Sequence, residues 1–325
     1  MSVTVTPATA AGRPEGEEVV TGGGQRGSTA MSGHGLTPWL FLAPYLVLFL
    51  AFVVAPAIYG IWISLHDWDY TLPGKPFVGL DNYPNLFDSS SLASDRFWGS
   101  MKATAIFTVM SVPLLLVVPL AVALAMNQKF RGRNLFRAIY FAPYVLGVAV
   151  VAVVWRFLLD NNIGLVNHYL GLVGLPDDIA WTTSVPAAWF ALVGVTVWWT
   201  LGFNAVIYLA GLQDIPQELY EAAALDGAGP WQQIRGITIP LLGRTTTLVA
   251  VLQVIASLKV FDQMYIMTQG GPNFATRSIL QYVYDEGFTN FRVGYASAVS
   301  MLFFVVVLAV SAIWFWLVRK QEKET

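Results

Sequence analysis

Long apolar stretches alternate with shorter polar segments along residues 36–325 of the chain. Six of the stretches exceed about 20 residues, the length that an α-helix needs to cross the hydrocarbon of a bilayer. They cover approximately residues 39–65, 101–126, 138–159, 187–212, 241–264 and 295–318. Because backbone polar groups find no water at that depth, runs of this length must be helical. The pattern predicts an all-α integral membrane protein with six transmembrane helices.

The segment before these stretches, residues 1–35, has a different composition. It contains mainly Gly, Ser, Thr, Ala and a few charges, with almost no large apolar side chains. Such a segment cannot bury a core, so we expect a disordered tail and a transmembrane domain over residues 36–325. Within the predicted spans, prolines should kink the helices at Pro44, Pro56, Pro113, Pro119 and Pro143.

Composition supports the membrane interpretation and excludes several functions. Of 325 residues, 56% are hydrophobic and 12% are charged, whereas soluble domains carry about 25% charged residues. The net charge of −2 offers no basic surface for nucleic acid. The chain has no Cys and only three widely separated His, namely His34, His66 and His168. We therefore expect no metal site.

The distribution of Lys and Arg predicts the orientation of the spans. The loop between the second and third spans carries Lys129, Arg131, Arg133 and Arg137 without an acid, and Arg319, Lys320 and Lys323 follow the last span. The segment 160–186 has three acids and no Lys or Arg. Since basic residues are retained on the cytoplasmic side, we expect a multi-pass protein of the plasma or inner membrane with both termini in the cytoplasm.

The loop of residues 213–240 lies on the same predicted side, although it is acidic. Asp214 and Pro216 should begin a short helix that Gly227 ends. A second short helix should begin near Pro230, before Pro240 leads into the fifth span. The first helix presents a small apolar patch built by Leu219, Ala222 and Ala223. A patch of this kind on an intracellular loop indicates a docking partner.

The residues of this loop resemble a known family. Glu221-Ala222-Ala223-Ala224-Leu225-Asp226-Gly227-Ala228, followed by Ile237-Thr238-Ile239-Pro240, is similar to the EAA loop of bacterial ABC importer permeases. Further motifs are similar to the MalF/UgpA-like, carbohydrate-uptake branch of these binding-protein-dependent, MetI-like permeases: Phe261-Asp262, Thr268-Gln269-Gly270-Gly271-Pro272, Gln281-Tyr282-Val283-Tyr284 and Gly294-Tyr295-Ala296-Ser297-Ala298. The resemblance covers residues from about 36 to the end and implies a type I ABC importer permease fold.

The resemblance also implies partners. In this family the loop is a coupling helix for a separate ATPase subunit, which would assign that role to Glu221, Ala222, Ala223, Asp226, Gly227, Ala228, Ile237 and Pro240. Alternatively, Glu221 and Asp226 only solvate an interfacial helix. A second homologous permease, two ATPase subunits holding ATP and Mg, and an extracytoplasmic binding protein that delivers a sugar or polyol are implied. The chain lacks the extra N-terminal spans and large external domain of the maltose-type member, which leaves the substrate open.

No catalytic set is evident in the sequence. A GxxxxGK[ST] phosphate loop is missing, and no Ser-His-Asp or paired-carboxylate arrangement has a shared context, so we expect a transporter subunit without cofactor or catalytic residues. An ATP-independent secondary transporter would show inverted repeats and intramembrane carboxylates. A membrane enzyme or scaffold would gather titratable residues at one face. Neither alternative explains the loop of residues 213–240.

Polar side chains inside spans are costly in lipid, so they should face the bundle interior or a wet cavity. The candidates for a substrate path are Asn204, Tyr208, Gln253, Lys259 and Asp262. Lys259 and Asp262 are three residues apart and could instead pair on one helix and only hold its packing. Trp198, Trp199 and Tyr208 could stack on sugar rings or pack against neighbouring helices.

Overall fold

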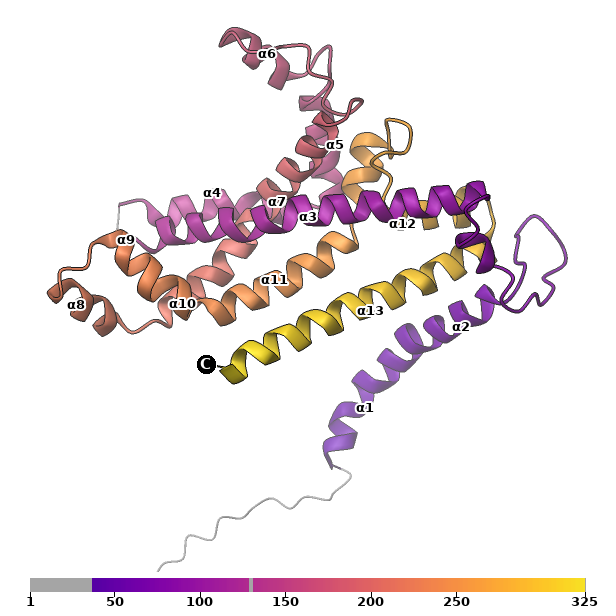
Figure 1. The fold of residues 1–325 in the computed structure, drawn as a ribbon, viewed down its shortest axis with the longest axis horizontal. Coiled ribbons are helices and arrows are strands. Elements are labelled where there is room, and N and C mark those ends of the chain that lie inside the picture. Colours follow the sequence, from indigo (N-terminus) through magenta and orange to yellow (C-terminus); the bar gives the residue numbers. More distant parts are fainter. Residues whose placement is uncertain (1–36, 129–130, 325) are drawn as a thin grey trace, which may run out of the picture. The chain divides into compact units, whose positions relative to one another are not determined.

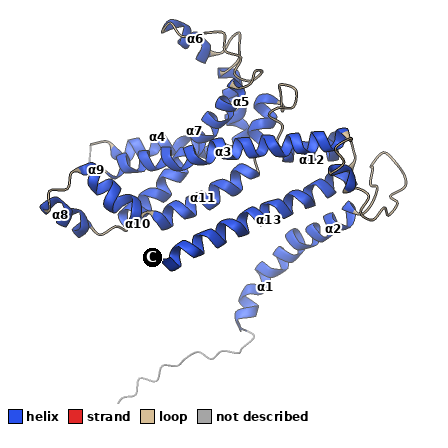
Figure 2. Ribbon diagram, in the orientation of Figure 1, coloured by secondary structure: helices blue, strands red, loops and turns tan. Residues whose placement is uncertain are grey.

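The computed structural model describes residues 37–128 and 131–324 (Figure 1). The predicted disordered tail, residues 1–35, lies outside the described residues. Helices dominate the described part of the chain (Figure 2), where the β-structure amounts to two isolated bridges, His66 with Phe77 and Asp69 with Arg292. The predicted all-α architecture is therefore confirmed.

The order of helices follows the apolar stretches. The α-helices are α1 (Thr37–Phe49), α2 (Ala55–Ser64), α3 (Leu92–Asn127), α4 (Arg133–Val145), α5 (Val148–Leu158), α6 (Leu165–Leu172), α7 (Ala187–Gln213), α8 (Gln217–Leu225), α9 (Pro230–Gln233), α10 (Ile239–Leu241), α11 (Gly243–Leu258), α12 (Ile279–Tyr284) and α13 (Val293–Glu324). The π-helical turns η1 (Leu50–Val54), η3 (Ile234–Thr238), η4 (Met264–Thr268) and η5 (Asp285–Thr289) and the 3₁₀ turn η2 (Pro84–Leu86) join them.

The described residues form two compact units, one ending at Val53 and one beginning at Val54. The first unit contains α1, whose side chains from Trp39 onward are largely exposed, as expected of a helix that faces lipid. The π turn η1 ends two residues before Pro56, whose ring would otherwise meet the carbonyl of Phe52 in an α-helix. Proline in this span is thus accommodated by a local change of helix type.

The second unit is organised around α3. This helix packs along α7 and α11, and α13 packs against α2. Residues of α3 belong to three apolar cores along its length. Phe97 packs with α12 and α13, Phe107 packs with α5 and α7, and Met126 packs with the end of α7 and with α11. The long second span therefore connects one end of the bundle to the other.

Within the described residues, four helical segments are long and apolar enough to cross a membrane, namely Trp39–Ser64, Leu92–Asn127, Ala187–Gln213 and Val293–Trp316. Two bent helix pairs, α4 with α5 and the α9–α10 segment with α11, raise the number to six if each pair is one crossing. These two pairs correspond to the predicted third and fifth spans, and each is bent where the prediction has one continuous helix.

The predicted third span, residues 138–159, is not one helix. α4 and α5 meet at an angle of 97°, because Leu146 and Gly147 adopt extended backbone conformations. Pro143 lies in the last turn of α4 and lacks an N–H donor there, and Gly147 has a low helix propensity. The apolar run of the predicted third span therefore contains a helix break between α4 and α5, which Pro143 and Gly147 permit.

The predicted fifth span, residues 241–264, is wrong at its end. α11 stops at Leu258, since Lys259 leaves the helical conformation and Val260 donates to the carbonyl of Ser257 in a tighter turn. At the start, Pro230–Leu241 forms a helical segment that meets α11 at 64°. Pro240 lies inside α10, two residues before the break at Leu242.

Candidate coupling helix and substrate cleft

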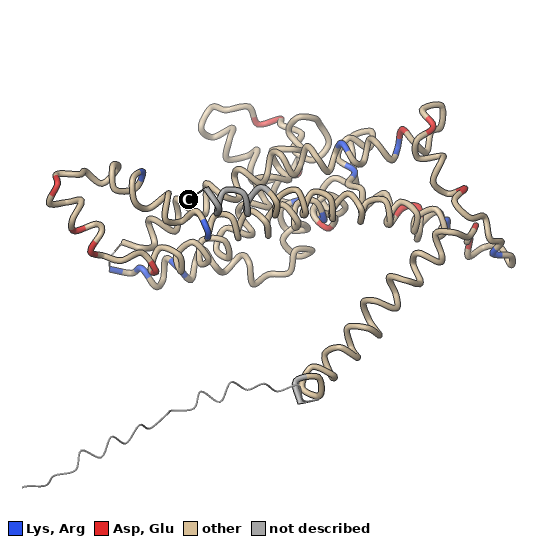
Figure 3. The backbone as a smooth tube through the Cα atoms, turned by 60° about the horizontal axis from the view of Figure 1, so that its bottom comes forward, with Lys and Arg blue, Asp and Glu red and all other residues tan. Residues whose placement is uncertain are grey.

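The candidate coupling residues lie mainly on α8 and the turn that follows it. Figure 1 shows α8 at one end of the bundle, beside α9 and α10, and Figure 3 shows acidic positions at that end. Glu221 and Asp226 are exposed, Ala223 is half-buried, and Leu225 is 90% exposed. The sequence-predicted patch of Leu219 and the Ala pair is on this same exposed helix. It presents acids and small apolar side chains together.

Gly227 ends α8 as predicted. Its φ of +82° is left-handed, which glycine adopts without a clash of Cβ. The N–H of Ala228 donates to the carbonyl of Ala223 at 2.9 Å, and the N–H of Gly227 donates to that of Ala224 at 3.1 Å. These two bonds form a Schellman cap, in which a glycine satisfies the last helical carbonyls. The Asp226-Gly227-Ala228 part of the motif therefore sets the exit direction of the chain.

One side-chain hydrogen bond connects α8 to the segment that leads into α11. The hydroxyls of Tyr220 and Thr238 are 2.9 Å apart, and Thr238 is 2% exposed. Ile237, half-buried, and Pro240, exposed, belong to the same Ile234–Leu241 stretch. A displacement of α8 would therefore act on the bent pair that ends in α11.

A separate cleft gathers several of the candidate substrate residues. It has a volume of about 170 Å³ and lies among α3, α7 and the end of α11. Of the five candidates, Gln253, Lys259 and Asp262 line it. Four polar side chains that the sequence reasoning missed also line it, namely Thr196, Thr200, Ser257 and Gln263. Their signal was weak, since hydroxyls in spans commonly bond back to the helix, as Thr196 and Thr200 do here.

Asn204 lies behind this cleft and contacts it through Gln253. The Nε2 of Gln253 donates to the Oδ1 of Asn204 at 2.8 Å, which joins α11 to α7. Asn204 is fully buried, and its Nδ2 lacks a hydrogen-bond partner among the described residues. The pair is therefore a polar contact between two spans that faces the cleft on one side.

The alternative that Lys259 and Asp262 pair on one helix is wrong. α11 has ended before Lys259, so the i,i+3 spacing no longer places both side chains on one helical face. The ion pairs within the described residues are Arg277–Asp285 and Arg292–Glu286. Lys259 is exposed and Asp262 half-buried at the cleft lining. The helix break allows both charges to face an open space instead of lipid.

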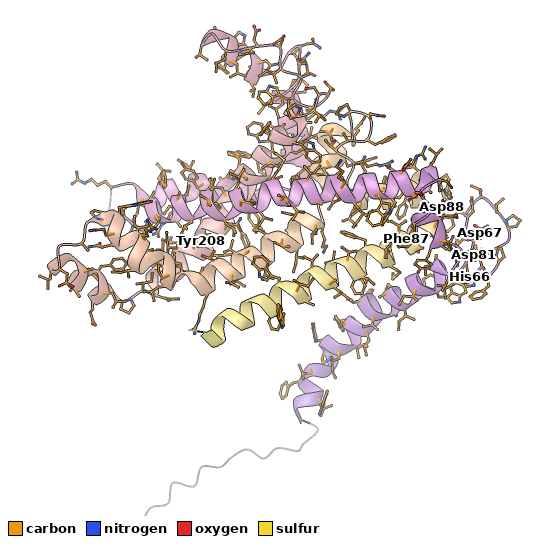
Figure 4. The ribbon with its side chains drawn as sticks, viewed as in Figure 1. His66, Asp67, Asp81, Phe87, Asp88 and Tyr208 are labelled. Atoms are coloured by element: carbon orange, nitrogen blue, oxygen red, sulfur yellow. The ribbon has the colours of Figure 1, made fainter. Side chains whose placement is uncertain are left out.

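The three aromatic candidates, Tyr208, Trp198 and Trp199, lie in different environments. Tyr208 is fully buried in the core with Met126, Leu212 and Leu242, and Figure 4 shows it towards the α8–α10 end of the bundle; it does not line the cleft. Trp199 lines the cleft, and its Nε1 donates to the carbonyl of Leu146 at 3.0 Å. Trp198 packs edge-on against the ring of Trp155 at 5.3 Å. Only Trp199 of the three is placed for stacking on a solute in the cleft.

Comparison with known proteins identifies the family. Residues 117–323 match the binding-protein-dependent transport system inner membrane component family. The trehalose/maltose transport system permease protein MalF of Thermococcus litoralis is 36% identical over 85% of this chain and 91% of its own length. The sn-glycerol-3-phosphate transport system permease protein UgpA of Shigella flexneri is 34% identical over 84% and 91%.

Solved structures agree with this assignment. A bacterial ABC transporter involved in the import of the acidic polysaccharide alginate contains a chain with a TM-score of 0.77 and 25% identity, which covers 87% of this chain and 95% of that one. The fold is thus that of the type I ABC importer permeases. The chain belongs to the family of binding-protein-dependent transport system inner membrane components, and it is a multi-pass membrane protein of the carbohydrate-uptake type.

Proposed function

We propose that this chain is one of two transmembrane subunits of an ATP-driven importer that moves a sugar or polyol into the cell. Several similar permeases are named for trehalose and maltose, for sn-glycerol-3-phosphate and for starch degradation products. A chain similar to this one has been solved in a transporter bound to a periplasmic protein. In the proposed complex an extracytoplasmic binding protein delivers the solute and a second homologous permease completes the pathway.

The main observation in support is the exposed helix α8, which ends in a glycine cap at Gly227 and is joined to the following segment by the Tyr220–Thr238 hydrogen bond. In the proposal, two separate ATPase subunits hold ATP and Mg, and α8 docks on one of them. Glu221 and Asp226 then face basic side chains of that partner, while the small residues Ala222 and Ala223 permit close approach. Closure of the ATPase pair moves α8, and the Tyr220–Thr238 bond passes the movement to the segment leading into α11.

The cleft supplies the proposed solute path. Gln253, Lys259, Asp262 and Thr200 offer hydrogen-bond donors and acceptors, and Trp199 offers an aromatic ring. A sugar needs both, because its hydroxyls require polar partners and its ring faces are apolar. Transport requires that the cleft face opposite sides in two global states, and the docked ATPase biases the equilibrium between these states.

The test is ATPase activity stimulated by the binding protein in the reconstituted complex. Glu221→Lys and Gly227→Pro should abolish stimulation while the complex stays assembled, because one reverses a docking charge and the other cannot adopt a positive φ. Glu218→Gln, an exposed change on the same helix, is the matched control for expression and folding. If Glu221→Lys and Gly227→Pro both leave stimulation and assembly intact, α8 does not couple to an ATPase.

A further inference from the structure

A second concave site lies at the end of α3 that is far from α8. It is a groove of about 420 Å³ between the first turns of α3, the start of α7 and the loop of residues 273–277. It shares no lining residue with the cleft described above. Its volume falls in the range of about 300–1,000 Å³ that is typical of small-molecule sites.

The charges that line the groove are mostly positive. Arg96 and Lys102 are exposed on α3, and Arg277 lines the groove from the opposite side. Asp95 is the only carboxylate among the lining residues. The lining therefore carries three cations and one acid; Asp285, which does not line the groove, offsets part of the charge of Arg277, so Arg96 and Lys102 supply the remaining positive charge at the mouth.

Arg277 is the unusual member of this set. It is 5% exposed, and a charge at this depth is costly unless paired and hydrogen-bonded. Its Nε donates to Ser100 at 3.2 Å, while Asp285 lies 4.0 Å from Nη1, beyond hydrogen-bond distance. A guanidinium has five N–H donors, so most of the donors of Arg277 lack an acceptor within the described residues. Arg277 therefore lies at the groove wall with one hydrogen bond, to Ser100, and one ion-pair partner, Asp285, among the described residues, which leaves donors of its guanidinium for a ligand.

Arg277 is buried and contacts two aromatic rings. Burial lowers the pKa of this guanidinium and raises that of Asp285, although each charge partly offsets the burial of the other. The Cζ of Arg277 lies 4.3 Å from the ring centre of Phe274 and 4.8 Å from that of Tyr282. Both rings thus contact the guanidinium, whose planar fork of donors matches a carboxylate or phosphate.

The backbone of the groove wall is strained. Asn273 and Phe274 have φ values of +48° and +61°, a left-handed region that is unfavourable for non-glycine residues. The bonds of Thr276 hold this loop closed: its hydroxyl donates to the carbonyl of Gly271, and its N–H donates to that of Gly270 at 3.0 Å. Strain maintained in this way is concentrated at binding sites. Here it places the half-exposed ring of Phe274 at the groove wall.

We propose that this groove binds the carboxylate or phosphate group of a small anionic solute, such as a hexuronate, with Arg277 as the central ligand. Arg96 and Lys102 add positive charge at the mouth, and Phe274 and Trp189 provide apolar surface for the body of the solute. The inference does not depend on transport or on an ATPase, since it concerns binding to this chain alone. A phospholipid headgroup carries the same phosphate chemistry, and the experiment below distinguishes it from a free solute.

The test is calorimetric binding to the full chain in nanodiscs of zwitterionic lipid at low salt. Galacturonate and inorganic phosphate should bind saturably, neutral galactose should not, and binding should weaken as salt screens the charges. Arg96→Gln and Lys102→Gln should each weaken galacturonate binding by about fivefold, as expected for loss of one charge contact near a surface. Arg277→Gln should abolish binding. Lys75→Gln, which removes a cation over the ring of Trp68 outside the groove, should change nothing.

Three outcomes would overturn the proposal. Equal binding of galactose and galacturonate would contradict selectivity for an anionic group. Unchanged affinity in Arg96→Gln and Lys102→Gln would show that galacturonate does not bind in this groove. Both variants alter exposed side chains, so misfolding does not explain a negative result. The third outcome assigns the site to lipid instead. Native mass spectrometry would then show phosphatidylglycerol retained by the wild type and lost in Lys102→Gln, and the same lipid would displace galacturonate from the nanodisc.

Discussion

Gly202 allows α4 to lie directly against α7. A Cβ at this position would overlap the carbonyl oxygen of Tyr140 and the Cα of Phe141, which are backbone atoms and cannot rotate away. Small residues have this function in membrane helix pairs, where close backbone approach replaces the hydrophobic effect. The absence of a side chain at Gly202 thus allows the backbone of α4 at Tyr140 and Phe141 to lie against α7.

Gly202→Ala should therefore separate α4 from α7 and lower the thermal unfolding midpoint of the purified chain in detergent. Overpacking of this kind costs about 1–3 kcal/mol. Gly194→Ala on the same helix is the matched control, because nothing lies within 4 Å of its added Cβ, and it should be neutral or slightly stabilising. Equal midpoints for the two variants would contradict the close approach.

Gly227 sets a second residue-level requirement, the left-handed backbone at the end of α8. Gly227→Asn should retain most ATPase stimulation, since asparagine tolerates this conformation, whereas Gly227→Val should lose it. No atom lies within 4 Å of an added Cβ, so the difference would report backbone conformation and not collision. The measurement is stimulated ATPase activity of the complex, and similar activity in both variants would contradict this account.

At the scale of elements, the sequence predicted the two short helices of the loop 213–240 because their signals are local. Pro216, Gly227 and Pro230 each act on the adjacent backbone, and α8 and α9 begin and end beside them. The breaks inside apolar runs were not predictable in the same way. The backbone leaves the helical conformation at Leu146 and Lys259 although the surrounding residues are apolar, and hydropathy alone does not predict such a break.

The connection between α8 and η3 gives a prediction at the same scale. Tyr220→Phe and Thr238→Val each remove one hydroxyl of the Tyr220–Thr238 hydrogen bond, worth about 0.5–1.5 kcal/mol in a typical case; Thr238→Val also removes a longer contact of 3.5 Å to the carbonyl of Gln233. If that bond transmits movement, each variant should reduce stimulated ATPase activity and the double variant should be no worse than either single one. Additive losses would show that the two hydroxyls act separately.

At the scale of the whole molecule, the family and the all-α fold followed from the sequence, because apolar runs and motif spacing persist along the chain. The lining of the candidate substrate cleft followed only in part. Gln253, Lys259 and Asp262 come together there, but Tyr208 belongs to a packed core. The groove around Arg277 was missed, since its lining joins α3, α7 and a loop that are distant in sequence and carries no periodic signal.

The number of membrane crossings remains a prediction of the apolar stretches, and the 97° bend between α4 and α5 leaves two topologies that an experiment can distinguish. The chain has no cysteine, so single cysteines at Ser89, Asn162 and Glu221, all exposed, report their own side with a membrane-impermeant maleimide. If the bent pair is one crossing, Ser89→Cys and Asn162→Cys should label on intact cells and Glu221→Cys only after permeabilisation. If the pair re-enters instead, Asn162→Cys would be protected and Glu221→Cys labelled, because every crossing after the bend would be inverted. That second pattern would also place α8 outside the cell and exclude coupling to a cytoplasmic ATPase.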